Sequence, residues 1–211
     1  MFKKFREIAL KHIQGNLIIY FLVCMFFIIG ISAGAFTIKA LGNIQKQELI
    51  NYLKNFFQIL GDKPIDEFSV LKQSLTNNLQ TGAFIWLLGI TVIGVPLILL
   101  LIAIRGFVIG FTVGFLTEQL GFKGILFSLL SIFPQNLFII PSILVIAVIG
   151  ISFSTMMIRN KLNKSHYNNS TFRQFIMYST IVFSIFSVII LGCIMEAYVT
   201  PVFMRAISQY M

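Results

Sequence analysis

Charged side chains are scarce in this chain of 211 residues. They make up 11% of the sequence, against about 25% in soluble domains, whereas hydrophobic residues make up 57%. The mean hydropathy is +0.91. This scarcity excludes an ordinary soluble domain. It predicts an integral membrane protein in which residues 1–211 form a single membrane domain.

Cysteine and histidine are also rare, with two residues of each. Cys24 and Cys193 lie inside apolar runs, so they provide neither a disulfide framework nor metal-ligand spacing. His12 and His166 have no cysteine near them in the sequence. The chain also lacks a phosphate-binding glycine loop, a Gly-x-Ser-x-Gly elbow and a His-Glu-x-x-His motif. These absences argue against an enzyme, a metal site and a cofactor.

Acidic residues are fewer than basic residues, which gives a formal net charge of +9. The basic residues flank hydrophobic runs instead of forming one stripe, as nucleic-acid binding would need. Such flanking charge is typical of membrane topology and of contact with anionic membrane lipid. We therefore expect lipid, and no nucleic acid, as the partner of this charge.

Hydrophobic segments long enough to cross a membrane, some only marginally, predict an all-α polytopic helix bundle with five transmembrane helices. These spans cover residues 17–36, 83–104, 106–120, 125–154 and 175–200. Arg105 is expected to close the second span, and Gly106 to let the chain turn back. The fourth span has 30 residues, about 45 Å as one helix. Because that exceeds the apolar core of a bilayer, Pro134 and Pro141 are expected to break or tilt it.

The distribution of lysine and arginine predicts the orientation. Residues 155–174 carry basic residues and no acid, so they form a cytoplasmic loop, and the basic amino terminus is cytoplasmic too. Residues 37–82 and the carboxyl terminus are then extracytoplasmic. A re-entrant hairpin over 106–133 would move the basic loop outside, which the charge rule disfavours.

The extracytoplasmic segment predicts two amphipathic helices separated by residues 61–64, with Asp62 as the cap of the second. Its apolar faces are candidates for docking a partner. These residues are Leu49, Leu53, Phe56, Phe57, Phe68, Leu71 and Leu75. The segment can also fold as a lid on the membrane surface, and the two roles are compatible.

Glycines at four-residue intervals predict close contact between helices. Gly106, Gly110 and Gly114 form a doubled small-xxx-small pattern, and Gly30 and Gly34 put small residues on one face of the first span. The pattern leaves open whether the chain also associates with a second copy.

Polar residues interrupt the fourth span at Pro134, Gln135 and Asn136. Amides near the middle of a membrane often mark a functional site. They can equally satisfy backbone groups that Pro134 leaves without partners. The sequence leaves these two interpretations open.

Glu196 is the one acid inside a predicted span. We expect it near the outer boundary, with Lys39 or Lys123 at a suitable depth to pair with it and Arg105 too far away at the inner boundary. A channel or transporter subunit that uses Gln135, Asn136 and Glu196 is therefore an alternative function.

Several motifs together resemble the stage II sporulation protein M family over nearly the whole chain. They are Gly94-Val-Pro96, Arg105-Gly-Phe107, Gly110-Phe-Thr-Val-Gly114, Gly121-Phe-Lys-Gly124, Pro134-Gln-Asn136, Pro141 and Glu196-Ala-Tyr-Val-Thr200-Pro201. Relatives in the broader family carry His-Gly where this chain has Gln135-Asn136, which favours the sporulation branch.

The resemblance implies a role in the complex that remodels peptidoglycan during engulfment of the forespore. It implies two partners, stage II sporulation protein P, an amidase and endopeptidase, and stage II sporulation protein D, a lytic transglycosylase. It places the protein in the septal and engulfing mother-cell membrane, as a non-enzymatic scaffold that localises these enzymes. Anchoring an enzyme in the membrane raises its effective concentration near the wall.

Overall fold

The computed structural model describes residues 14–62, 66–91, 93–162 and 170–202, and these ranges are almost entirely helical, with no strand. The helices are α2 (Leu17–Ala40), α3 (Asn43–Asp62), α4 (Glu67–Gly89), α5 (Gly94–Leu120), α6 (Phe122–Ser131), α7 (Phe133–Leu162) and α8 (Ser170–Tyr198). The predicted all-α membrane bundle is confirmed.

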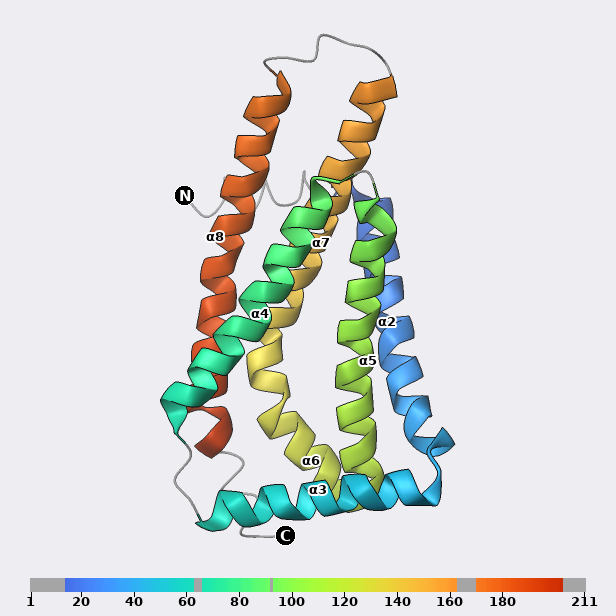
Figure 1. The fold of residues 1–211 in the computed structure, drawn as a ribbon, viewed down its shortest axis with the longest axis vertical. Helices are drawn as coiled ribbons and strands as arrows, with labels where there is room; N and C mark the ends of the chain where they lie inside the picture. Colours follow the sequence, from blue (N-terminus) through green and yellow to red (C-terminus); the bar gives the residue numbers. More distant parts are fainter. Residues whose placement is uncertain (1–13, 63–65, 92, 163–169, 203–211) are drawn as a thin grey trace.

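The long helices run between two ends of the molecule (Figure 1). Helices α2, α5 and α8 run from the upper end of Figure 1 to the lower end, and α4 and the pair α6–α7 run back. The α4–α5 turn lies at the upper end, and α3 lies across the lower end. Alternation of this kind is what a chain that crosses a lipid layer repeatedly produces.

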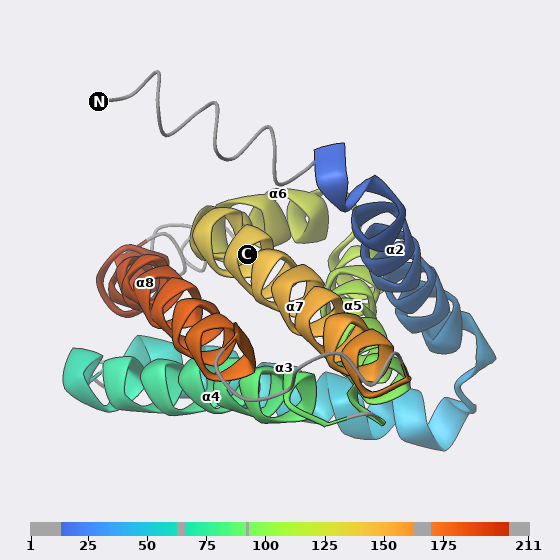
Figure 2. The same ribbon diagram turned by 90° about the horizontal axis from the view of Figure 1, so that it is seen from above.

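Helix α7 lies at the centre of the bundle, where it contacts α2, α4, α5, α6 and α8 (Figure 2). In the most apolar 18-residue stretch of α7, 61% of the residues are buried, whereas the corresponding share in α2 is 17%. Ile146, Ala147 and Val148 are fully buried. The isoleucine-rich sequence of α7 therefore forms the core, and the surrounding helices separate it from lipid.

Four helical segments are long and apolar enough to cross a membrane: Leu17–Ala40, Gly94–Leu120, Phe133–Arg159 and Phe172–Val202. Their outward faces carry large apolar side chains, as on α2, where Ile18 is 81% exposed and Phe21 is 71% exposed. Apolar surface of this extent is stable against lipid and unfavourable in water. Helix α4 runs alongside them but is more polar, so the five crossings stay a prediction.

The predicted boundary between the second and third spans is wrong. Helix α5 continues through Arg105 and Gly106, and the chain turns back earlier, between Gly89 and Gly94. Pro96 therefore lies in the first turn of α5, where the missing N–H of proline is tolerated, and does not kink a span. As a consequence Arg105 lies near the middle of a membrane-length helix and not at its end.

The predicted break near Pro134 exists, but Pro141 does not break the helix. Helix α6 ends at Ser131 and α7 begins at Phe133, so Pro134 occupies the first turn of α7. Pro141 lies inside α7, which continues to Leu162. At the α5–α6 turn, Gly121 has φ 57°, a left-handed conformation that glycine adopts without strain.

The five glycines of the predicted packing pattern lie together, in a contact between the parallel helices α2 and α5 that we call the glycine seam. An added Cβ at Gly30 would overlap the carbonyl oxygen of Ala103, and one at Gly34 would overlap that of Phe107. The glycines of α5 face the backbone of α2 in the same way. Gly106 faces the carbonyl of Phe27, Gly110 faces the carbonyl of Ile31, and Gly114 lies against Ala35. The sequence indicated the small residues but not which helices they join.

The second amphipathic helix begins later than predicted, and its cap is a different aspartate. Asp66 is the N-cap of α4, and its carboxylate accepts hydrogen bonds from Ser69 Oγ at 2.5 Å and from the backbone N–H of Phe68 at 3.2 Å. The bond from Ser69 lowers the pKa of Asp66 below its ordinary value, because it stabilises the charged carboxylate. Asp62 is instead the last residue of α3.

Candidate functional site: a buried polar network between three helices

Helix α4 presents polar residues at four-residue spacing to its neighbours α5 and α8. Ser74 and Asn78 lie one turn apart on the same face and are 4% and 5% exposed. Asn78 Nδ2 donates to the Ser74 carbonyl oxygen at 3.0 Å and lies 3.3 Å from Ser74 Oγ. This leaves Asn78 Oδ1 available as an acceptor toward α5.

Arg105 of α5 fills that position. Its guanidinium donates to Asn78 Oδ1, and to Thr81 Oγ1 at 3.4 Å. Because Arg105 lies near the middle of α5, its side chain would be costly in lipid without such partners. The two acceptors on α4 turn the charged group toward the bundle and away from the lipid-facing side.

Glu196 of α8 completes the chain of contacts. Its Oε2 accepts a hydrogen bond from Ser74 Oγ at 2.6 Å, and Asn78 Nδ2 lies 3.6 Å from Cys193 Sγ on the same helix. Glu196 also interacts electrostatically with the guanidinium of Arg105. Arg105, Asn78, Ser74 and Glu196, which we call the polar network, thus join a cation to a carboxylate through two neutral side chains.

The predicted partners of Glu196 are therefore wrong. Lys39 or Lys123 was expected, and Arg105 was excluded because a turn was placed at Gly106. The structure connects Glu196 to Arg105 through Ser74 and Asn78. Sequence reasoning missed Ser74 and Asn78, although Ser74, Asn78 and Gly82 form a four-residue pattern of small or polar residues that indicates a buried helix face.

A second polar contact lies just beyond the end of α8. The Thr200 hydroxyl donates to Gln135 Oε1 at 2.6 Å and lies 3.3 Å from the Ser131 carbonyl oxygen. Asn136 Nδ2 donates to the Ile132 carbonyl at 2.8 Å. Gln135 thus contacts a side chain and not a backbone group freed by Pro134, and Asn136 shares the Ile132 carbonyl with its own backbone N–H. Both interpretations of these amides therefore stay open.

Replacing Gln135 by leucine is expected to destabilise the bundle by about 1 kcal/mol, because the Thr200 hydroxyl loses its shorter hydrogen bond. Asn136→Leu should cost less, because the Ile132 carbonyl keeps its hydrogen bond from the backbone N–H of residue 136. The measurement is the free energy of unfolding in mixed micelles. Thr180→Val, which removes an exposed hydroxyl bonded within its own helix, is the control. Equal stability of Gln135→Leu and wild type would show that the contact contributes nothing.

A very small cavity is lined by one residue of each polar region, Arg105 and Asn136. It has a volume of about 10 Å³, and isoleucines such as Ile102 and Ile139 form most of the rest of its wall. That volume is at the lower limit for one water molecule. The channel interpretation requires a continuous polar cavity that reaches Gln135, Asn136 and Glu196, and this cavity does not provide it.

The candidate docking residues separate into two groups. Leu71 and Leu75 are half-buried and pack against the buried core, whereas Phe68 is 71% exposed at the start of α4. Leu49 and Leu53 of α3 are half-buried. The side chains of Phe56 and Phe57 lie outside the described residues.

Metal chemistry has no visible basis in the part of the chain that the structure describes. There, no group of three histidine, cysteine, aspartate or glutamate side chains could hold an ion. Both cysteines are free, Cys24 exposed on α2 and Cys193 buried on α8. His12 and His166 lie outside the described residues.

Together these features define the class of the molecule: an all-helical, multi-pass membrane protein whose helices are joined by a glycine seam and by a polar network in an apolar interior. The family model of stage II sporulation protein M matches residues 23–201. The chain therefore belongs to the stage II sporulation protein M family, and it is a sporulation-related membrane protein. No curated protein and no solved structure gives a significant match to the chain.

Proposed function

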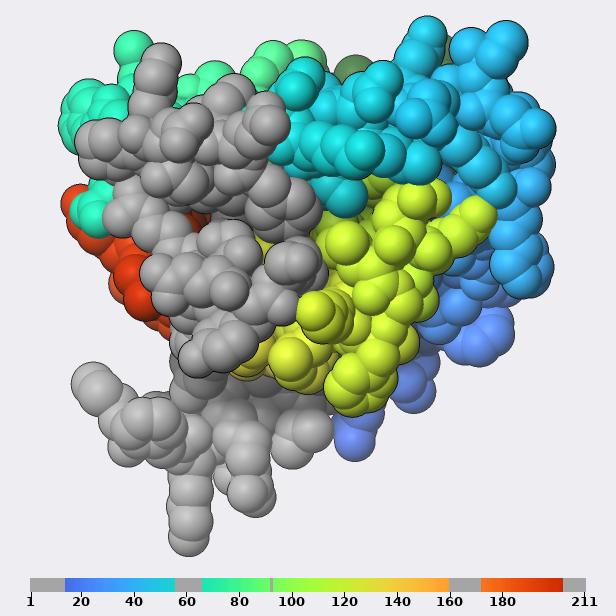
Figure 3. Space-filling model, turned by 90° about the horizontal axis from the view of Figure 1, so that it is seen from below, coloured from blue at the N-terminus to red at the C-terminus, as the bar shows by residue number. Residues whose placement is uncertain are grey.

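We propose that the protein is a non-enzymatic membrane scaffold that localises peptidoglycan-degrading enzymes during engulfment. The observation that carries this proposal is helix α3. It lies across the lower end of the bundle, and none of its described side chains belongs to the buried core (Figures 1 and 3). Ile44 and Tyr52 on this helix are 79% and 72% exposed.

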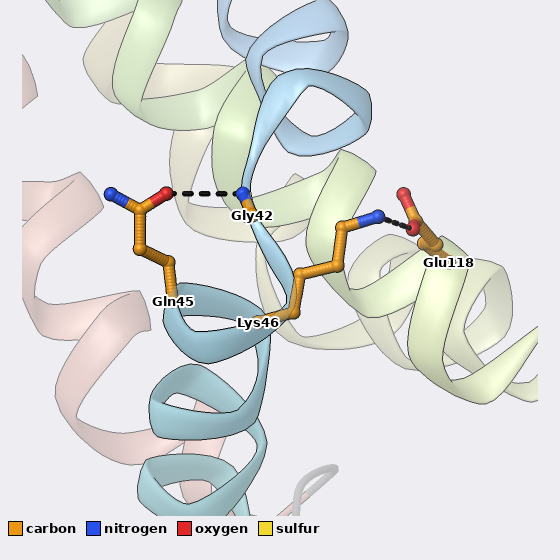
Figure 4. Close-up of polar contacts among 4 residues, drawn as sticks. All are labelled: Gly42, Gln45, Lys46 and Glu118. Atoms are coloured by element: carbon orange, nitrogen blue, oxygen red, sulfur yellow. Dashed lines mark hydrogen bonds and ion pairs between the residues drawn. The ribbon is translucent and has the colours of Figure 1, made fainter.

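An amphipathic helix of this kind is available to a partner because the bundle does not use it. Among the described side chains, an ion pair between Lys46 Nζ and Glu118 Oε1 at 2.8 Å joins α3 to the bundle, and Gln45 Oε1 accepts from the Gly42 N–H at 3.1 Å where the helix begins (Figure 4). Both contacts involve partly exposed groups, which contribute little to stability. They hold α3 in place and leave its remaining surface available.

The partners that the family resemblance implies are stage II sporulation protein P and stage II sporulation protein D. Both act on peptidoglycan, so the docking helix must lie on the wall side. The charge pattern supports this orientation, because the basic segments 1–15 and 155–174 contain one acid, Glu7, whereas most other acids fall near α3. The amino terminus is then cytoplasmic and the carboxyl terminus extracytoplasmic.

Replacing α3, Asn43–Asp62, by a Gly-Ser segment of equal length tests the docking role. Because α3 adds no described side chain to the core, we expect the protein to stay in the membrane at its normal level. Recovery of both enzymes by co-purification from sporulating cells should fall at least tenfold. A finer variant, Ile44→Ser with Tyr52→Ser, should reduce recovery in the same direction. Its control is Ile93→Ser, an equally exposed position at the upper end. Undiminished recovery with the replaced helix would end the docking proposal.

The orientation has its own test. In a background in which Cys24 and Cys193 are replaced by alanine, Phe122→Cys at the lower end should react with a membrane-impermeant thiol reagent added to intact cells. His166→Cys should react only after permeabilisation. The reverse pattern would place α3 in the cytoplasm, away from the wall, and would contradict the scaffold role.

A further inference from the structure

A groove lies beside α3 at the lower end of the molecule, between α2 and α5. It has a volume of about 690 Å³, within the range of small-molecule sites. One part of it is apolar and includes Ile31, Ala35 and Val113, and the part next to α3, which we call its mouth, carries the charged side chains of Lys39, Lys46 and Glu118. The groove follows the glycine seam, since Gly110 and Gly114 also line it.

The groove is apolar at one end and charged at the other, as a phospholipid is from its acyl chain to its headgroup. Helices α2 and α5 are parallel, so Lys39 and Glu118 lie at the same end of the pair. From Ile31 to Lys39 is eight residues, about 12 Å along a helix. A chain of CH₂ groups can therefore lie against Ile31, Ala35 and Val113 while a polar headgroup reaches the lysines.

The charge at the mouth favours an anion. Two lysines face one carboxylate, and Glu118 already contacts Lys46 at 2.8 Å (Figure 4). The side chains of Lys46 and Glu118 are 26% and 35% exposed, so a ligand can reach them. Lys39 lies in the last turn of α2 and is exposed. An incoming phosphate would gain the charge of Lys39 and compete with Glu118 for Lys46.

We infer that this groove binds one anionic phospholipid, with its phosphate at Lys39 and Lys46 and an acyl chain along Ile31, Ala35 and Val113. The site goes beyond the scaffold role and does not depend on it. Lipid bound there would cover the end of the glycine seam and sit next to the first turn of α3. Glu118 sets the affinity, because it holds Lys46 when the lipid is absent.

The experiment measures retention of phosphatidylglycerol and of phosphatidylcholine by the purified full-length protein, using native mass spectrometry. Wild type is expected to retain phosphatidylglycerol preferentially. Lys39→Gln and Lys46→Gln should each lower that affinity about fivefold, the effect of one basic residue at an anionic surface. Lys54→Gln, which removes the same charge further along α3, is the matched control and should leave retention unchanged.

Glu118→Gln distinguishes binding from a structural role of the ion pair. If Lys46 binds phosphate, removing its competitor raises phosphatidylglycerol affinity, whereas Lys46→Gln lowers it. If the pair only holds α3 in place, the two substitutions lower retention alike, and the proposal is overturned. Equal retention by Lys39→Gln, Lys46→Gln and Lys54→Gln would overturn it as well.

Val113→Trp tests the acyl-chain part with both lysines intact. The larger side chain should reduce phosphatidylglycerol retention by about fivefold or more, while soluble glycerol phosphate, used as a competitor, should displace little lipid from wild type. If glycerol phosphate competes as well as the lipid does, the site binds free phosphate and the lipid assignment is wrong. Thermal unfolding of each variant confirms that it is folded before retention is compared.

Discussion

Adding a single methyl group at Gly34 or Gly110 is expected to destabilise the protein by about 2 to 3 kcal/mol. An added Cβ at Gly34 would overlap the backbone carbonyl of Phe107, and one at Gly110 would overlap that of Ile31. Backbone atoms cannot turn aside as a flexible side chain can. Helices α2 and α5 would have to separate, and the dispersion contacts along the whole seam would weaken.

The free energy of unfolding of Gly34→Ala and Gly110→Ala, measured in mixed micelles, checks this expectation. Gly15→Ala is the control, because a Cβ there meets no atom within 4 Å. Gly114→Ala should have an intermediate effect of about 1 kcal/mol, since its Cβ would lie 3.2 Å from Ala35 Cα, a contact that a small shift relieves. Stability equal to that of Gly15→Ala at both seam positions would show that the helices are not held at this distance.

The glycine seam also shows how far the sequence determines the fold. Small residues at four-residue spacing have one physical use in a lipid layer, which is close helix contact, so they could be recognised from the sequence alone. Which helices approach each other could not be recognised, because glycine carries no side chain that specifies a partner. That Gly30 and Gly34 lie on the helix that packs against Gly106 and Gly110 emerges only from the fold.

The turn between α4 and α5 was misplaced for a related reason. Residues 90–93 read Ile-Thr-Val-Ile, and this apolar stretch offers few of the usual turn signals. Arg105, by contrast, looked like the end of a span, because a charged residue is expected at the membrane boundary. That expectation fails where neighbouring helices supply partners for the charge, and here Asn78 and Thr81 do so. The position of one half-buried arginine therefore decided the boundaries of two predicted spans.

The contacts of the polar network could not be predicted from the sequence, although the four-residue spacing of Ser74 and Asn78 was a partial signal. Ser74 and Asn78 appear in the sequence as part of a polar segment, and their burial depends on α4 packing against α5 and α8. The sequence did identify Glu196 as an unusual acid, but its hydrogen bond comes from a residue 122 positions away. Contacts over such separations follow from the packing of whole helices, which local periodicity does not report.

Arg105→Met and Glu196→Gln are each expected to destabilise the protein by about 3 kcal/mol, and the double variant by much less than the sum. Removing either group alone leaves the opposite charge inside the bundle without its counter-charge, although it keeps its hydrogen bonds to neutral side chains. Removing both charges leaves Ser74 and Asn78 able to bond to neutral groups. The double-mutant cycle should therefore show a coupling of about 2 kcal/mol or more in the free energy of unfolding.

The exposed pair Lys46–Glu118 provides the matched cycle. Lys46→Met and Glu118→Gln remove the same charges at partly exposed positions, so each should cost no more than about 1 kcal/mol, with little coupling. Additive losses for Arg105 and Glu196 would mean that the two charges act independently and that the network does not transmit their interaction. The double variant also separates stability from function, provided that it is folded and coupled as expected. Normal sporulation in cells that carry it would show that the network is structural. Failed engulfment with a folded protein would show that the charges of the network are themselves needed for function.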